Sequence, residues 1–373
     1  MMKKILVVLL SMTFFLAFTA GCSSTKSNES KTNESNTNNK KPYIAMISKG
    51  FQHQFWQTVY AGAKDAAKKY NVDITFEGPP SESDISTQVD MLKNALSKHP
   101  AAIGLAALDT ESVKSLLEEA KNDGIPVIGF DSGVPNAPAG SVVSTVATNN
   151  YAAGQLAAEK MFNNSDFQKQ LKAATPDNPV TIAVQSQDAT SESIVDRTRG
   201  FIDEMVKEVN GVFPGAVEVV GHDLFKKPAS KPVVVSIKVV VPPSTSMTDA
   251  QSAAYTTLTT TKNLIGYFMS NELSANAVLA ATSDGTDLDR EHGKYKNIIA
   301  IGFDAGKAQK NAVRKQYFYG SITQDPYNIG YKAVETAYKV IKGEKVPKVI
   351  DTGAKFYTHE NMDNKDIAPL LYD

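Results

Sequence analysis

The chain has 373 residues but a single cysteine, Cys22, so no disulfide can form within one molecule. Its basic and acidic side chains nearly cancel, which leaves a formal net charge of −1. That balance provides no general attraction to nucleic acid or to an anionic membrane surface. The five histidines lie apart from one another with no pair at the spacing of metal ligands, so we expect no metal and no cofactor.

Common catalytic and phosphate-binding motifs are also missing. The sequence contains no Gly-x-Gly-x-x-Gly after a strand, no Gly-x-x-x-x-Gly-Lys-Ser/Thr loop and no Gly-x-Ser-x-Gly turn. These absences argue against a nucleotide-dependent enzyme and against an α/β-hydrolase. A protein that binds a ligand without transforming it is the better expectation.

The first residues carry an export pattern. Lys3 and Lys4 precede the apolar run 5–18, and the small residues Ala20 and Gly21 come just before the cysteine. This order is typical of a cleaved secretory signal, and the run is shorter than the ~20 residues of a membrane span.

The segment resembles a bacterial lipoprotein signal, although Thr19 stands where that family prefers Leu. The resemblance implies cleavage after residue 21 and lipid attachment to Cys22. Residues 23–41 contain no apolar side chain, so we expect 22–41 to be a disordered tether between the lipid and a folded domain.

From Pro42 onward, strand and helix patterns alternate. We expect strands at 43–47, 73–76, 102–108 and 126–130, with helices at 55–70, 85–96 and 112–121 between them. Such alternation predicts a parallel sheet covered by helices on both faces. Ligands of these sheets bind at the carboxyl ends of the strands, here 48–50, 108–109 and 131–133.

The pattern repeats later in the chain. Residues 125–133 and 298–306 are both β-rich apolar runs that end in Gly-Phe-Asp, a small residue and Gly. Two lobes of the same topology, each presenting an aspartate at an equivalent strand end, explain this economically. The second lobe has an apparent insertion at 209–247, within which 231–241 is predicted to be a strand.

Several segments together resemble the ribose/galactose-type (type I) periplasmic binding proteins over nearly all of residues 43–360. They are Ile47–Gly50 with Phe55–Trp56, Gly124–Asp131, Val146–Gly154, Arg197–Phe201, Phe268–Asn271, Ile301–Asp304, Gly320–Pro326, Gly330–Val334 and Gly343–Val346. The resemblance implies an α/β fold of two similar doubly wound parallel-sheet lobes, joined by a three-strand hinge with crossovers near 148–150, 324–326 and 351–352.

By the same resemblance, the N-terminal lobe comprises 43–148 plus 326–351 and the C-terminal lobe 149–325 plus 352–373. The ligand expected between them is a pentose or hexose, and inositol or a furanosyl signalling molecule would satisfy the same polar groups. The implied partners are a permease of the ABC type and its ATPase subunits, served by a monomer lipid-anchored on the extracytoplasmic face of the cell membrane.

A sugar needs carboxylates and amides for its hydroxyls and aromatic rings for its C–H faces. The resemblance places Phe55 and Trp56 as stacking aromatics, with core packing as the other reading of Phe55. It places one polar contact at Gln52 or His53, and the longer loop here leaves open which of the two points inward.

The remaining candidates come from strand ends and the hinge. Asp131 and its counterpart Asp304 match carboxylates that bind sugar hydroxyls, unless they cap the following helices. The other matched positions are Ser132 (where the family often has Arg), Asn271, the hinge amide Gln324 and Arg197, which either contacts ligand or is an ion-pair partner. Lys49 and Asp109 are further strand-end candidates.

Three other functions use the same features. Asp131 and Asp304 could serve as the acid and base of a secreted glycoside hydrolase. The effector domain of lac-repressor-like regulators has the same fold, but an export signal stands where those proteins carry a helix-turn-helix. A lipoprotein that senses its ligand for a chemoreceptor or sensor kinase would share the binding chemistry and differ only in its partner.

Overall fold

A computed structural model describes residues 41–372. The predicted signal segment, Cys22 and all of the predicted tether 22–41 except its last residue lie outside the described residues. Within 41–372, no helix is both long enough and apolar enough to cross a bilayer.

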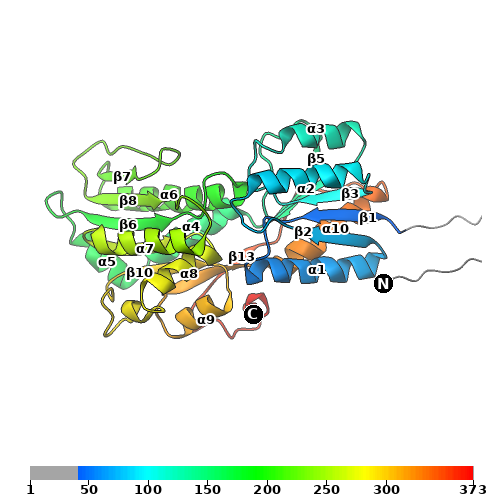
Figure 1. Ribbon diagram of the computed structural model, residues 1–373. Helices are drawn as coiled ribbons and strands as arrows, with labels where there is room; N and C mark the ends of the chain where they lie inside the picture. Colours follow the sequence, from blue (N-terminus) through cyan, green and yellow to red (C-terminus); the bar gives the residue numbers. More distant parts are fainter. Residues whose placement is uncertain (1–40, 373) are drawn as a thin grey trace, which may run out of the picture. The chain divides into compact units, whose positions relative to one another are not determined.

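The first sheet contains six strands, all parallel, in the order β12-β5-β4-β3-β1-β2 (Figure 1). Its strands are β1 (Tyr43–Ile47), β2 (Asp73–Glu77), β3 (Ala102–Leu105), β4 (Val127–Phe130), β5 (Val142–Ala147) and β12 (Val349–Asp351). β1 is buried on both faces, as expected for the interior of a parallel sheet, because Ile44 and Met46 join one apolar cluster while Ala45 and Ile47 join another.

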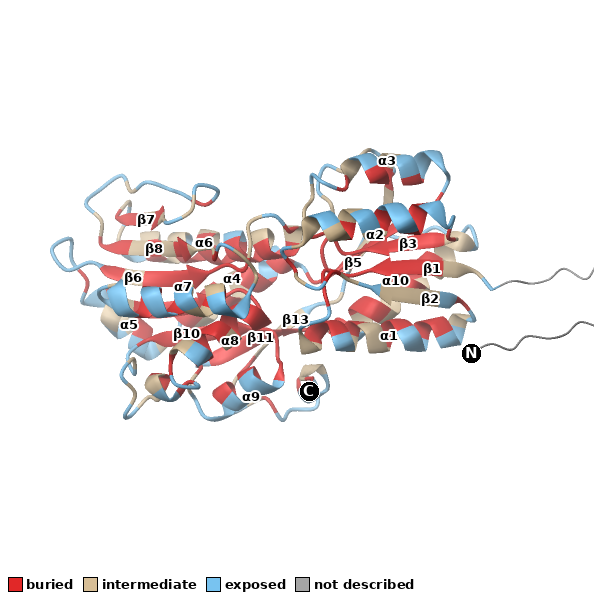
Figure 2. Ribbon diagram, in the orientation of Figure 1, coloured by how far each residue is buried: buried red, intermediate tan, exposed pale blue. Residues whose placement is uncertain are grey.

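Helices cover both faces of this sheet. α1 (Gln54–Tyr70) and α10 (Pro326–Ile341) pack together on one face, and α2 (Ile85–Ser97) and α3 (Lys114–Asn122) cover the other. Each turns an apolar side to the sheet and a polar side to solvent, as the burial pattern shows (Figure 2). We call this sheet and its four helices the first lobe.

The second sheet contains seven strands in the order β13-β11-β10-β9-β6-β8-β7, parallel except for β13 at one edge. Its strands are β6 (Val180–Gln185), β7 (Val217–Val220), β8 (Val235–Val240), β9 (Leu264–Met269), β10 (Ile299–Phe303), β11 (Gly320–Gln324) and β13 (Ala354–Tyr357). With its helices it forms the second lobe.

The helices of the second lobe divide in the same way. One face carries α4 (Asn150–Phe162), α5 (Ser165–Lys172) and α6 (Glu192–Val212), and the other carries α7 (Met247–Thr260), α8 (Glu272–Ala281) and α9 (Lys307–Arg314). Two short 3₁₀ turns, Thr286–Leu288 and Ala368–Leu370, complete the described elements.

The chain passes between the lobes three times: between β5 and α4, between β11 and α10, and between β12 and β13. The predicted two-lobed α/β fold with a three-segment hinge is therefore confirmed. The residue boundaries assigned to each lobe stay a prediction.

The interpretation of 209–247 as an insertion needs correction. Most of the predicted strand 231–241 forms β8, which pairs with β6 as β2 pairs with β1 in the first lobe. What the second lobe adds is the edge strand β7 and the loop after it. The Val-rich pattern is thus explained by an interior strand in which Val235, Ile237 and Val239 are buried.

In each lobe, two helices approach so closely that glycine is required at the crossing. A Cβ atom on Gly62 of α1 would lie 1.9 Å from the Tyr327 carbonyl oxygen of α10. In the second lobe, a Cβ on Gly200 of α6 would lie 2.0 Å from the Tyr151 carbonyl oxygen of α4. Each pair joins the helix that follows the first strand of its lobe, α1 after β1 and α6 after β6, to a helix that begins just after a crossover.

Candidate ligand-binding site

The two strand-end aspartates have the same backbone geometry. Asp131 follows β4 with φ 59°, and Asp304 follows β10 with φ 81°, both in the left-handed region that is costly for residues other than glycine. The Asp131 N–H donates to the Val146 carbonyl on β5, and the Asp304 N–H to the Ile322 carbonyl on β11. The sharp turn directs each carboxylate off its strand end, as the sequence repeat predicts.

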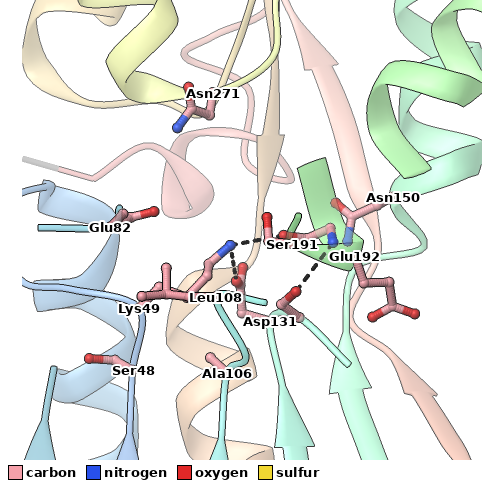
Figure 3. A network of polar contacts seen from close by, with 12 residues as sticks. Ser48, Lys49, Glu82, Ala106, Leu108, Asp131, Asn150, Ser191, Glu192 and Asn271 are labelled. Carbon is pink, nitrogen blue, oxygen red and sulfur yellow. Dashed lines mark hydrogen bonds and ion pairs between the residues drawn. The ribbon is translucent and has the colours of Figure 1, made fainter. Parts of the chain in front are cut away.

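Lys49, at the end of β1, pairs with Asp131. Its ammonium lies 3.0 Å from Asp131 Oδ2 (Figure 3). It also donates at 2.9 Å to Ser193 Oγ at the start of α6. Burial would lower the pKa of Lys49, but the charges of Asp131 and Glu82 outweigh it, and the pKa is raised. The cation is therefore firmly charged although its side chain is only 5% exposed.

Glu82, in the loop after β2, was not predicted. Its Oε1 accepts from the indole Nε1 of Trp56 at 2.7 Å, and its Oε2 accepts from Gln187 Nε2 at 3.0 Å. His53 Nε2 lies 3.7 Å from Oε1. Burial pushes the pKa of Glu82 upward, but the charges of His53 and Lys49 and these hydrogen bonds outweigh it, and the pKa is lowered.

Asp304 is held by an amide and a backbone N–H. Its Oδ1 accepts from Gln324 Nε2 at 2.7 Å and its Oδ2 from the Glu272 N–H at 3.0 Å. Burial raises the pKa of Asp304, and the charge of Arg197 opposes this only partly. Gln324 Oε1 is buried and has no hydrogen-bond partner among residues 41–372, so it remains free to accept from a ligand.

Arg197 of α6 is 2% exposed and held by polar groups on the second lobe. Nη1 donates to the Ser270 carbonyl at 2.6 Å, while Nη2 and Nε donate to Asn150 Oδ1 at 2.7 and 3.3 Å. Its guanidinium carbon lies 3.5 Å from the centre of the Phe303 ring. Burial lowers its pKa from the usual high value, yet a guanidinium stays charged.

These groups line a small cavity at the carboxyl ends of both sheets, with a volume of about 20 Å³. That is about the space of one water molecule and far below the roughly 300–1,000 Å³ of small-molecule pockets, so a sugar needs the lobes to move apart before it can enter. The wall consists of Lys49, His53, Phe55, Trp56, Glu82, Asp131, Ser193, Ile194, Arg197, Asn271, Glu272, Asp304 and Gln324.

Eight of the ten predicted ligand residues are among them, and so is Lys49. Of the alternatives left open, His53 lines the cavity, whereas Gln52 is exposed and does not. Ser132 is buried outside the cavity and accepts from the Ser193 N–H at 3.3 Å. Asp109 bonds the hydroxyl of Ser112 just before α3 and is also outside the cavity. Whether the lining residues contact ligand stays a prediction.

Phe55 and Trp56 are almost fully buried at the start of α1. Their rings meet edge to face with centroids 5.0 Å apart, and Trp56 packs similarly on Phe130 at 6.3 Å. Both core packing and cavity lining therefore describe these residues. Asn271 also has two roles, because its Oδ1 caps α8 by accepting from the Ser274 N–H while its Nδ2 donates to Gln187.

The sequence analysis missed Glu82, Glu272, Ser193 and Ile194. Glu82 follows β2, and Glu272 begins the helix after β9, so the strand-end rule applied to every strand would have drawn attention to both. Ser193 and Ile194 begin α6 and carry no comparable local signal.

Direct contacts link the lobes around the cavity. Besides Lys49–Ser193 and Glu82–Gln187, the Glu272 carboxylate lies 3.4 Å from the backbone nitrogens of Gln54 and Phe55. A ligand that entered here would exchange hydrogen bonds with groups that now bond across the two lobes.

Comparisons with known proteins agree with this geometry. Over residues 44–345 the sequence matches a model described as a periplasmic binding protein domain. It is 23% identical over 368 residues to the ribose import binding protein of Bacillus subtilis (strain 168), covering 96% of this chain and 100% of that protein.

Two solved structures are similar over most of the chain. One, described as an ABC transporter, LacI family transcriptional regulator from Brachyspira murdochii, has a TM-score of 0.73 at 36% identity, with 90% of this chain and 100% of that one covered. The other, an ABC transporter solute binding protein from Agrobacterium vitis with bound D-fucose, has a TM-score of 0.72 at 29% identity, with 88% and 100% covered. From its two-lobed fold, its strand-end site and these matches, the chain belongs to the periplasmic binding protein domain family.

Proposed function

We propose that this protein captures a monosaccharide in the cavity between its lobes and delivers it to an ABC import permease. The observation that carries the proposal is the composition of the cavity wall. Carboxylates, amides and two cations from both lobes converge beside two aromatic rings, the set of groups that a polyhydroxylated ring requires. The B. subtilis relative is a ribose import binding protein, and the A. vitis relative holds D-fucose.

Binding would proceed by exchange of hydrogen-bond partners. With the lobes apart, Lys49, Glu82 and Glu272 would lose their contacts to the opposite lobe and be hydrated. Sugar hydroxyls that both donate and accept would then replace Ser193 at Lys49 and occupy the unpartnered Oε1 of Gln324. Since only the closed arrangement brings both walls to the ligand, binding would favour closure about the three-segment hinge.

Selectivity would follow from the cost of burying unpaired polar groups. A sugar lacking a hydroxyl opposite Asp131 or Asp304 would leave a buried carboxylate without its full set of donors, which costs ~1–3 kcal/mol per missing partner. Ser132 stands where the family often has Arg, and it lies outside the cavity. The guanidinium beside the ligand would therefore be that of Arg197. The same groups are assigned binding roles only, and catalysis forms no part of the proposal.

The location and the partners belong to the same proposal. Cleavage before Cys22 and its lipidation would anchor the protein to the extracytoplasmic face of the membrane, with residues 23–41 as the tether. It would act as a monomer, because closure and docking on the permease require both lobes to move freely, and the ATPase subunits would drive import.

Isothermal titration calorimetry on residues 42–373 tests the proposal, since residues 41–373 form one compact unit. The ligands are a panel of pentoses, hexoses and polyols. We expect one-to-one binding of at least one monosaccharide at micromolar or tighter affinity, abolished by Asp131→Ala. Asp109→Ala is the matched control, because Asp109 ends a neighbouring strand but lies outside the cavity. Absence of binding across the panel, or equal loss in both variants, would refute the proposal.

A further inference from the structure

The cavity wall carries more negative than positive side chains. Its carboxylates are Glu82, Asp131, Glu272 and Asp304, and its permanent cations are Lys49 and Arg197. Leaving His53 aside, the wall carries two more negative than positive groups. A neutral sugar does nothing to reduce that excess.

Three of the four carboxylates have a cation or strong donors of their own. Asp131 has Lys49, Glu82 has the indole of Trp56 with His53 nearby, and Asp304 has the amide of Gln324. Glu272 differs from them. Among residues 41–372, its two oxygens accept only long hydrogen bonds, 3.4 Å each, from the backbone nitrogens of Gln54 and Phe55.

Glu272 is nevertheless buried, with 6% of its surface exposed. A buried carboxylate without a hydrogen-bonded cation is costly: burial raises the pKa of Glu272, the charge of His53 lowers it in part, and the charge of Asp304 raises it further. A Cβ on Gly306 would lie 3.0 Å from Gln54 Oε1 and 3.1 Å from Glu272 Oε1, so the glycine leaves room for both side chains.

A second acceptor in the same cavity also lacks a donor. Gln324 Oε1 is buried and has no partner among residues 41–372. Unmet acceptors call for a ligand rich in donors, and a protonated amine supplies three donors, no acceptor and a positive charge. A hydroxyl in the same place supplies one donor and leaves the charge excess unchanged.

We propose that the ligand is an amino sugar, a monosaccharide-sized polyol whose ammonium group binds Glu272 in the cavity between the lobes. The inference rests on the proposed function and refines its ligand class. Glu272 would be the residue that distinguishes an amine from a hydroxyl at one ring position, while Asp131, Asp304 and Gln324 receive the remaining hydroxyls.

The test compares ligands that differ at one group. Residues 42–373 are titrated at pH 7 with glucose, galactose and mannose, with their 2-, 3- and 6-amino-deoxy forms, and with the N-acetyl derivatives of those amines. We expect at least one free amine to bind ten-fold or more tightly than both its parent sugar and its N-acetyl form. Glu272→Gln should reduce that preference to three-fold or less, and the exposed control Glu344→Gln should preserve it.

Parent sugars that bind as tightly as every amine would overturn the inference while leaving the proposed function in place. A preference that survives Glu272→Gln would equally overturn it. Absence of binding by any sugar, charged or neutral, would instead count against the proposed function itself. The comparison among ligands uses the unmodified residue, so it decides the question even where the variant folds poorly.

Discussion

Asp131 and Asp304 occupy the same turn in the two lobes, yet their surroundings differ. Asp131 is paired with a lysine ammonium at 3.0 Å, whereas Asp304 is held by an amide and a backbone N–H. The shared part is backbone geometry, which the repeated strand–turn sequence dictates. The side chains around each turn belong to the individual lobe, and they give one repeated scaffold two different chemical walls.

The wall from the first lobe supplies Lys49, His53 and the two aromatic rings, and the wall from the second supplies Arg197 and Asn271. The glutamates follow the same division. Glu82 is stabilised as an anion by its neighbours, whereas burial disfavours the anionic form of Glu272. A ligand that touches both walls therefore meets one wall whose glutamate charge is balanced by neighbouring groups and another whose glutamate charge is less well balanced.

The largest expected effect is a difference in how much stability is lost when each aspartate loses its partner. Lys49→Met leaves Asp131 buried without its cation, so the free energy of unfolding should fall by ~3–5 kcal/mol. Gln324→Leu removes only an amide from Asp304 and should cost ~1–3 kcal/mol. Urea unfolding at pH 7 measures both, and equal losses would show that the two carboxylates do not differ as described.

A smaller loss of stability is expected at the two helix crossings, and it should be the same in both lobes. Gly62→Ala and Gly200→Ala each place a Cβ about 2 Å from a backbone oxygen of the partner helix, so each should destabilise by ~1–3 kcal/mol. Gly211→Ala is the control within α6, since its Cβ meets nothing within 4 Å. That change should be neutral or stabilise by up to ~1 kcal/mol. A tolerated Gly62→Ala or Gly200→Ala would refute the close approach in that lobe.

The smallest expected effect is that neutralising Glu82 and neutralising Glu272 should change the free energy of unfolding in opposite directions. The pKa of Glu82 is lowered in the folded protein, so its ionised form stabilises the fold above the unfolded value of 4.5, and this is lost as pH falls through the folded pKa. Glu82→Gln should therefore lower the free energy of unfolding at pH 7, with the difference shrinking in acid.

The pKa of Glu272 is raised, so the folded state holds its proton more tightly and loses stability as pH rises from 4.5 through the folded pKa. Glu272→Gln should raise the free energy of unfolding of the ligand-free protein at pH 7, and this gain should vanish below pH 4.5. Urea titrations at both pH values test the pair. The same sign for both variants at pH 7 would contradict the assignment.

The sequence was sufficient for the features that depend on local pattern. Strand–helix alternation predicted the two sheets, and the repeated Gly-Phe-Asp turn predicted both aspartates at strand ends. It was insufficient where the outcome depends on packing between distant segments. The start of α1 turns His53 rather than Gln52 into the cavity, and β8 occupies an interior place in the sheet that its sequence position did not reveal.

Glu82 and Glu272 show the same limit within the site. Each lies just beyond the end of a strand, but the features that distinguish them come from the other lobe or from another loop. Gln187 reaches Glu82 across 105 residues of sequence, and the start of α1 reaches Glu272 across 217 and 218. No local pattern encodes such contacts, because they arise only when the lobes meet.

The central claim is that one cavity, built by both lobes, binds the sugar, and the single tryptophan of the chain lies in its wall. Fluorescence of Trp56 in residues 42–373, titrated with the sugar that calorimetry identifies, tests it most directly. The account predicts a saturable change in emission with one-to-one stoichiometry and the calorimetric affinity, abolished by Asp131→Ala in the first lobe and by Asp304→Ala in the second. Binding that leaves the emission of Trp56 unchanged, or that survives both substitutions, would place the sugar elsewhere and contradict the account.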